Sequence, residues 1–139
     1  MKNTVFAKSI AALLVIIGSA LAADAQCGGS KKNCPPNSPP PLGNYTCNIT
    51  RWDVSKRRIV YDYQGYFTLK AGGAYSWLDN GGAGKYAYDA KTYRIDWTGG
   101  HLANLGAITE FGLDGDDPEI TLTIKTESGD TVWQCALEK

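Results

Sequence analysis

From Asn44 onward the chain alternates apolar and polar residues with a period of two, and turn-forming residues interrupt the alternation at short intervals. In TYRIDWT (residues 92–98) an aromatic or aliphatic side chain occupies every second position. Successive side chains of a β-strand point to opposite faces, so this pattern predicts half-buried strands. The same pattern recurs at residues 58–63, 74–78, 85–89, 119–126 and 131–137. A helical period is not sustained in any window, although residues 101–107 allow one helical turn.

The connections between these segments are short and rich in Asp, Asn and Gly, at residues 79–82, 89–91, 99–100, 114–116 and 128–130. Parallel strands need crossovers of about a dozen residues or more, so short connections predict antiparallel neighbours. An open sheet would leave two edges and one apolar face exposed, and closure removes both problems. We therefore predict an all-β fold: an antiparallel up-and-down meander of about eight short strands, of about five to eight residues each, closed into a small barrel.

The four cysteines are Cys27, Cys34, Cys47 and Cys135. Four cysteines allow three pairings, and spacing alone does not choose between them. The alternation places Cys47 and Cys135 on the apolar faces of the first and last strands, as a bridge between neighbouring strands inside a barrel requires. This phase favours Cys47–Cys135 together with Cys27–Cys34. Because the chain has no C-x-x-C pair and a single histidine, we expect no metal site.

The chain divides into three regions by composition. Residues 1–25 resemble a signal peptide: Lys2 and Lys8 precede an apolar run, and Ala-Asp-Ala at 23–25 fits a cleavage site. The apolar run is too short to span a bilayer comfortably. Residues 26–43 form a Pro/Gly-rich N-terminal arm, and residues 44–139 form the β-barrel domain. We therefore expect a secreted protein, either extracellular or periplasmic.

Charge and motifs narrow the function classes. The chain has 14 Lys plus Arg and 14 Asp plus Glu, and this balance argues against a nucleic-acid binder, which needs a basic face. His101 is the only histidine, and Glu110 is a candidate to orient it. A lone histidine without a nucleophile motif is typically a surface loop residue. We expect no enzymatic activity, no catalytic residue and no cofactor.

Aromatic residues are the main candidates for a site. Trp52 and Tyr66 fall on the phase opposite to the inward residues Cys47 and Phe67, so we predict that they form an exposed contact surface. A bulge at Gly65 would reverse Tyr66. Eight further aromatics mostly follow the apolar phase of their strands, which predicts core positions; they are Tyr61, Tyr63, Tyr75, Trp77, Tyr86, Tyr88, Tyr93 and Trp97.

The polar motifs of the chain are interpreted as surface and turn features. The basic run at 55–58 lies between two strands, where a charged hairpin tip is expected. DGDDPE (residues 114–119) lacks EF-hand spacing and is interpreted as a hairpin turn. Asn44 and Asn48 begin N-glycosylation sequons on the outward phase, which carry glycans only in a host that glycosylates.

Three segments carry a family resemblance: GNYTC at 43–47, GKYAYDAKTYRIDW at 84–97 and VWQC at 132–135. They resemble the meander barrels of the lipocalin and avidin type, and also bacterial exported domains with Y-x-C near the start and W-x-C at the end. The resemblance implies binding rather than catalysis. The leading hypothesis is an exported, non-enzymatic domain that recognises a partner through its outer surface or loops.

Three alternatives remain at this stage. The first is a lipocalin-like carrier of a small apolar ligand. The second is a disulfide-stabilised surface or matrix assembly component. The third is a carbohydrate-binding module using Trp52, Tyr66 or Tyr75. The expected partner is accordingly a protein, a glycan or a small apolar ligand, with no nucleic acid and no membrane span in the mature chain.

Overall fold

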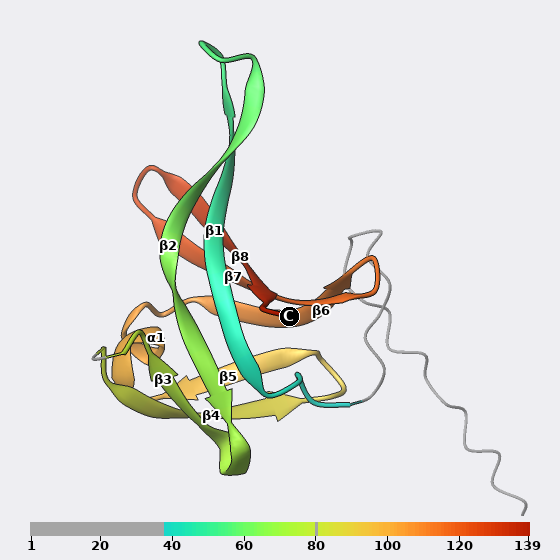
Figure 1. Cartoon of the computed structure of the whole chain (residues 1–139). Coiled ribbons are helices and arrows are strands. Elements are labelled where there is room, and N and C mark those ends of the chain that lie inside the picture. The colour runs from blue at the N-terminus through green and yellow to red at the C-terminus, as the bar shows by residue number, and fades with distance from the viewer. Residues whose placement is uncertain (1–37, 80) are drawn as a thin grey trace, which may run out of the picture.

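The computed structural model describes residues 38–79 and 81–139, which form an all-β barrel (Figure 1). Each described strand pairs antiparallel with the next along the chain, and the last pairs with the first. The predicted fold is thereby confirmed. The strands are β1 (Gly43–Asp53), β2 (Arg58–Lys70), β3 (Ala74–Trp77), β4 (Ala83–Asp89), β5 (Arg94–Thr98), β6 (Ile108–Asp114), β7 (Asp117–Thr126) and β8 (Gly129–Leu137). A 3-10 turn, Ala71–Gly73, precedes β3, and a short helix α1 (Gly100–Asn104) follows β5 within the segment predicted for one helical turn.

Turns form at the predicted segments 89–91 and 114–116, whereas residues 99–100 lead into α1. Asp114 and Asp117 pair across β6 and β7, so Gly115 and Asp116 make a two-residue hairpin turn inside DGDDPE. Between β4 and β5, the Asp89 carboxylate accepts hydrogen bonds from the Lys91 amide and the Thr92 hydroxyl. The first of these bonds contributes most to lowering the pKa of Asp89. The Asp89 carboxylate thus satisfies a turn amide that would otherwise need water.

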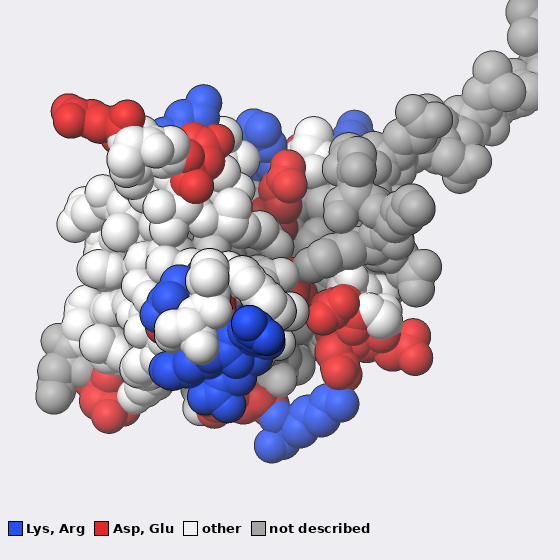
Figure 2. All heavy atoms as spheres, turned by 90° about the horizontal axis from the view of Figure 1, so that it is seen from above, with Lys and Arg blue, Asp and Glu red and all other residues white. Residues whose placement is uncertain are grey.

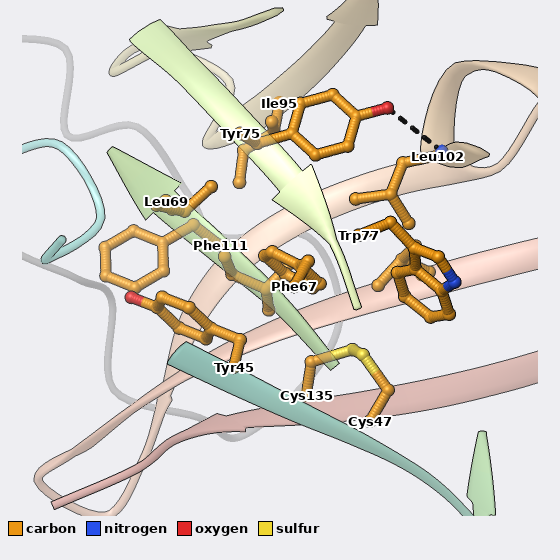
Figure 3. Packing of buried hydrophobic residues seen from close by; sticks show 12 residues of the cluster. Tyr45, Cys47, Phe67, Leu69, Tyr75, Trp77, Ile95, Leu102, Phe111 and Cys135 are labelled. Atoms are coloured by element: carbon orange, nitrogen blue, oxygen red, sulfur yellow. Dashed lines mark hydrogen bonds between the residues drawn. A yellow bond between two sulfur atoms is a disulfide. The ribbon is translucent and has the colours of Figure 1, made fainter. Parts of the chain in front are cut away.

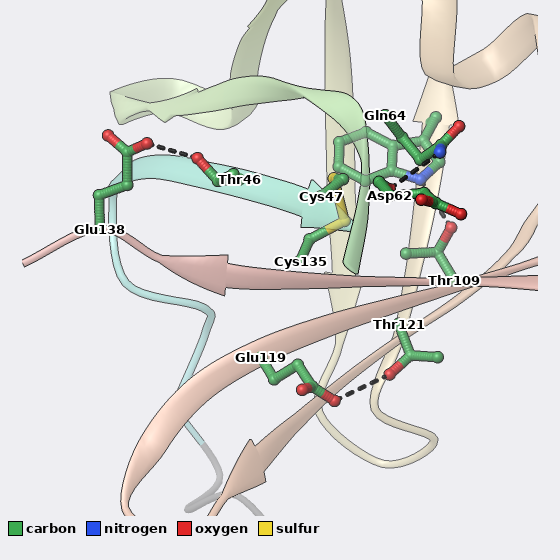
Figure 4. The surroundings of a disulfide bond; sticks show 10 residues. Thr46, Cys47, Asp62, Gln64, Thr109, Glu119, Thr121, Cys135 and Glu138 are labelled. Carbon is green, nitrogen blue, oxygen red and sulfur yellow. Dashed lines mark hydrogen bonds between the residues drawn. A yellow bond between two sulfur atoms is a disulfide. The ribbon is translucent and has the colours of Figure 1, made fainter. Parts of the chain in front are cut away.

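A disulfide closes the barrel between its first and last strands. Cys47 and Cys135 face each other in the register of β1 and β8, both are buried, and their sulfurs are bonded (Figure 4). The predicted Cys47–Cys135 pair is confirmed. The end of β8 is tied to β1 again outside the core, where the Glu138 carboxylate accepts from Thr46. Cys27, Cys34, residues 1–25 and residues 26–37 of the N-terminal arm lie outside the described residues.

Aromatic rings in mutual contact occupy the middle of the barrel (Figure 3). Tyr45 stacks on Phe67 with ring centroids 5.3 Å apart. The Trp97 indole meets Phe67 edge-on at 5.5 Å and Tyr75 at 4.9 Å. Such contacts stabilise a core beyond the area they bury. The interior of this barrel is therefore packed with rings where a carrier would need open space.

The hydroxyl of Tyr75 fastens α1 to the barrel. It donates to the Gly99 carbonyl at 2.7 Å. It accepts from the Leu102 amide at 3.0 Å (Figure 3). Leu102 itself is fully buried. The Tyr75 hydroxyl thus satisfies two backbone groups at the start of a helix that has no side-chain cap.

Tyr75→Phe is expected to lower the free energy of unfolding by about 1–3 kcal/mol, because it leaves a buried amide and a carbonyl without their hydrogen-bond partner. Tyr88→Phe is the matched control, since its buried hydroxyl has no hydrogen-bond partner among the described residues. That change is expected to be neutral or stabilising. Urea denaturation of both variants provides the measurement, and equal effects would contradict the assignment.

The weakest seam of the barrel lies between β5 and β6. Arg94 and Glu110 are their single register pair, joined by one further bond from the Phe111 amide to the Tyr93 carbonyl at 2.8 Å. A pocket of about 240 Å³ adjoins this seam, lined by residues 95–97, 102, 103, 106 and 107. The segment that contains α1 therefore lies where β5 and β6 have few backbone hydrogen bonds to each other.

Candidate functional site

The longest hairpin extends beyond the barrel. β1 pairs with β8 only over Tyr45–Asn48, and β2 pairs with β3 only over Phe67–Lys70. The two strands nevertheless pair with each other as far as Asp53 and Arg58. Residues 49–63 therefore form a two-stranded extension, named here the projecting hairpin, whose turn stands clear of the barrel (Figure 1). The expected strand length of five to eight residues is wrong here, since β1 has 11 residues and β2 has 13.

A β-bulge sets which way the projecting hairpin faces. Cys47 pairs with Gly65, but Asn48 pairs with Tyr63, so Gln64 is an extra residue in β2. One extra residue moves the following side chains to the other face. Gly65 has φ +132°, and a Cβ there would lie 2.5 Å from the Trp77 indole. Glycine is the residue that this backbone and this close contact allow.

The outer face of the projecting hairpin is apolar and exposed. Trp52 pairs with Ile59 across the strands, and Tyr61 and Tyr63 continue the same face. Val54 lies in the turn beyond them. The exposed fractions are 59% for Trp52, 78% for Val54, 54% for Ile59, 69% for Tyr61 and 60% for Tyr63. We name these five residues the aromatic face. A single exposed apolar residue needs no explanation, but a contiguous group indicates an interaction site.

The aromatic face both confirms and corrects the sequence analysis. Trp52 is exposed, as its phase predicts. The prediction that Tyr61 and Tyr63 are core residues is wrong. The bulge turns them outward, and they lie beyond the strands that would cover them. Gly65, inside an otherwise alternating strand, is the sequence signal for such a bulge. The same bulge explains the exposure of Ile59, which alternates in phase with Tyr61 and Tyr63. Val54 lies in the turn, outside the alternating segments, and has no sequence signal of its own.

Tyr66 faces outward as predicted but is only half exposed. It lies outside the projecting hairpin, and its hydroxyl donates to the Asp79 carboxylate. This hydrogen bond is the largest cause that raises the pKa of Tyr66 to about 12. Tyr66 is thus held against the loop after β3 and does not extend the aromatic face.

The raised pKa of Tyr66 gives a test of this bond. Tyr66 ordinarily ionises near pH 10.0, so any stability that the bond contributes is present below pH 10 and is lost as the pH rises toward 12. Asp79→Asn is expected to lower the pKa of Tyr66 toward 10. Ultraviolet titration of tyrosinate, with Tyr66→Phe as the blank for each background, measures the shift. An unchanged pKa in Asp79→Asn would disprove the partnership.

The turn of the projecting hairpin is ordered by Asp53 and is basic. The Asp53 carboxylate accepts from the Ser55 hydroxyl and from the amides of Ser55 and Lys56. These bonds, with that of the Ser55 hydroxyl first, lower the pKa of Asp53. Arg57 and Arg58 make no ion pair within the described part of the chain. Figure 2 looks down on this end and shows Lys and Arg gathered over the turn, where residues 55–58 were expected to form a charged tip.

The opposite, inner face of the projecting hairpin carries charges. Arg51 and Asp62 lie diagonally across the two strands and form an ion pair. Arg58 lies on the same face, opposite Asp53. The hairpin therefore presents an apolar outer face and a charged inner face.

The other candidate residues lie apart from this surface. The His101 ring stacks on Trp77 with centroids 4.4 Å apart, whereas Glu110 is exposed on β6 opposite Arg94. Tyr75, considered for a sugar platform, is buried. Asn44 is exposed and Asn48 half exposed on the outward phase, and their glycosylation stays a prediction.

Two further properties bear on the site. Within residues 38–79 and 81–139, no group of three or more His, Cys, Asp or Glu side chains is placed to hold a metal ion. In the same residues, no helix has both the length and the apolar character to cross a membrane.

Comparison with known proteins leaves the site to be interpreted from its own geometry. No protein-family model, curated protein or solved structure matches the chain. The resemblance to lipocalin and avidin barrels stays a prediction.

Proposed function

We propose that the protein is an exported, non-enzymatic binding domain that recognises a protein partner through the aromatic face. The observation that carries the proposal is the exposure of Trp52, Tyr61 and Tyr63 on one side of the projecting hairpin. Export is supported by the signal-peptide pattern of residues 1–25 and by the disulfide, which forms in oxidising compartments.

The composition of the projecting hairpin favours a protein as the partner. Trp, Tyr and Arg are the residue types that contribute most to protein–protein binding energy. The hairpin supplies one Trp, two Tyr and three Arg within 15 residues. Tyr and Trp side chains offer large contact areas at a small cost in conformational entropy. The aliphatic Val54 and Ile59 add to this apolar surface, which adjoins the basic turn at residues 55–58.

The charges of the projecting hairpin indicate which kind of protein surface it would bind. Residues 49–63 contain four basic and two acidic side chains. Arg51 and Lys56 are paired with Asp62 and Asp53, which leaves Arg57, in the turn at the end of the aromatic face, as a cation available to a partner on that side. We expect the partner to present an apolar groove with acidic residues at its rim, since complementary charge speeds association and orients docking.

A carrier function is less well supported. The rings of Tyr45, Phe67 and Trp97, which pack against one another, take up the interior that a ligand would need. The pocket near β5 measures about 240 Å³, below the usual range of about 300–1,000 Å³ for small-molecule sites. The aromatic face requires no internal space.

Site-specific photo-crosslinking tests the proposal. A benzophenone amino acid replaces Tyr63 in the protein secreted by its own host, and exposed Ala87 on β4 is the matched control position. Crosslinking is expected at position 63 to one discrete protein. Excess wild-type protein should compete it away, whereas excess Trp52→Ser/Tyr63→Ser should not.

Two outcomes contradict the proposal. One is equal crosslinking at positions 63 and 87. The other is equal competition by the wild type and the double variant. Ile108→Ser, which removes an exposed apolar residue from β6, serves as a further competitor. It is expected to compete as well as the wild type, because it leaves the aromatic face intact.

A further inference from the structure

The free edge of β2 in the projecting hairpin is an unused pairing surface. Among the described strands, only β1 pairs with residues 58–63, because β3 pairs with β2 no earlier than Phe67. Alternate amides and carbonyls of this stretch therefore face outward from the sheet edge. Such an edge is a template for another strand.

We infer that this edge pairs antiparallel with the same edge of a second copy of the chain. The segment Arg-Ile-Val-Tyr-Asp at 58–62 is self-complementary about Val60. In a two-fold pairing centred there, Arg58 lies opposite Asp62 of the second copy, and Asp62 opposite its Arg58. Ile59 lies opposite Tyr61, and Val60 opposite Val60. Opposite charges and aromatic–β-branched pairs are the favourable cross-strand combinations.

Other registers lose this complementarity. Moving the centre to Tyr61 places Val60 opposite Asp62, and moving it to Ile59 places Arg58 opposite Val60. If one strand slipped by one residue against the other, residues of the charged face of one copy would lie opposite residues of the aromatic face of the other. Only the pairing centred on Val60 matches both charges and keeps the faces in phase.

The neighbouring charges support the same pairing. Asp62 already pairs with Arg51 of its own chain, so Arg58 of the second copy would complete an Arg–Asp–Arg cluster. The cluster occurs at two symmetry-related places. The free edge of β1 is a poorer candidate, because Asp53 there is engaged by Ser55 and Lys56 of its own turn.

The pairing would produce one four-stranded sheet from two hairpins. Its outer side would join the two aromatic faces across the two-fold axis, with Ile59 and Tyr61 at the centre. The inner side would carry the charge clusters. This inference rests on the edge of β2 and not on the identity of any partner, so it stands or falls separately from the proposed function.

Charge exchange gives the test. Arg58→Asp places two acids opposite one another in a homodimer, and Asp62→Arg places two arginines opposite one another. Each single variant is expected to weaken self-association at least about tenfold, since like charges directly opposite are destabilising. In a mixture of the two variants, each Asp faces an Arg again. The mixture is therefore expected to form a one-to-one heterodimer with near wild-type affinity.

Analytical ultracentrifugation of the wild type, of each variant and of their mixture measures this, with circular dichroism to confirm folding. Arg58 also lies opposite Asp53 in its own hairpin, so Arg58→Asp alone could fray the turn, but mixing would not repair a frayed turn. A wild type that stays monomeric at about 1 mM overturns the inference. So does a dimer that neither variant weakens, or two weakened variants that fail to associate when mixed.

Discussion

Replacing both Cys47 and Cys135 with alanine is expected to lower the free energy of unfolding by about 4–5 kcal/mol. The disulfide joins residues separated by 88 positions. A crosslink over so long a loop removes much of the conformational freedom of the unfolded chain. A small domain is stable by only about 5–15 kcal/mol, so the loss is a large part of the total. Guanidinium denaturation of the wild type and the double variant provides the measurement.

Reduction of the wild type is the matched control, because it breaks the bond without removing the sulfur atoms. Reduced wild type and the double variant are expected to lose similar stability. Addition of reductant to the double variant isolates any contribution of Cys27 and Cys34. A loss under about 1 kcal/mol on breaking the Cys47–Cys135 bond would contradict the view that it is the main crosslink of the domain.

Gly65→Ala is expected to lower the free energy of unfolding by about 3 kcal/mol. Two causes add: a φ of +132° that L-residues rarely adopt, and a Cβ placed 2.5 Å from the Trp77 indole. The indole cannot move away freely, because it is nearly fully buried and stacks against the rings of His101 and Trp133. Denaturation measures the loss, and near-ultraviolet circular dichroism is expected to report the displaced tryptophan.

Gly112→Ala is the control for Gly65→Ala. Gly112 also lies inside a strand, but a Cβ there meets no atom within 4 Å. Its replacement is expected to be neutral or slightly stabilising, because alanine has less freedom to lose on folding. Equal destabilisation by the two substitutions would show that loss of strand glycine, and not the bulge, is responsible.

The sequence predicts the barrel well because two local patterns agree. Closure of the meander and the inward phase of Cys47 and Cys135 both favour neighbouring first and last strands with their apolar faces inward. Trp52 was predicted correctly for a related reason. Its phase is counted from Cys47 along one strand, and the bulge of this hairpin lies in β2 and leaves that count unchanged.

The aromatic face was missed because alternation shows which residues share a face but not what covers that face. Ile59, Tyr61 and Tyr63 have the pattern of a buried strand. Their exposure follows from the extra residue Gln64 and from the early ends of pairing with β3 and β8. Both are properties of the neighbouring strands and their register, which no local window contains.

The single register pair between β5 and β6 has a consequence for how the barrel opens. With β1 and β8 covalently joined, separation at this seam leaves all eight described strands in one continuous sheet, which begins at β6 and ends at β5. The edge strands of that sheet, β5 and β6, come from the middle of the chain. The strands nearest the chain termini, β1 and β8, lie at the centre of the sheet. Separation of β5 from β6 therefore does not divide the domain into two parts.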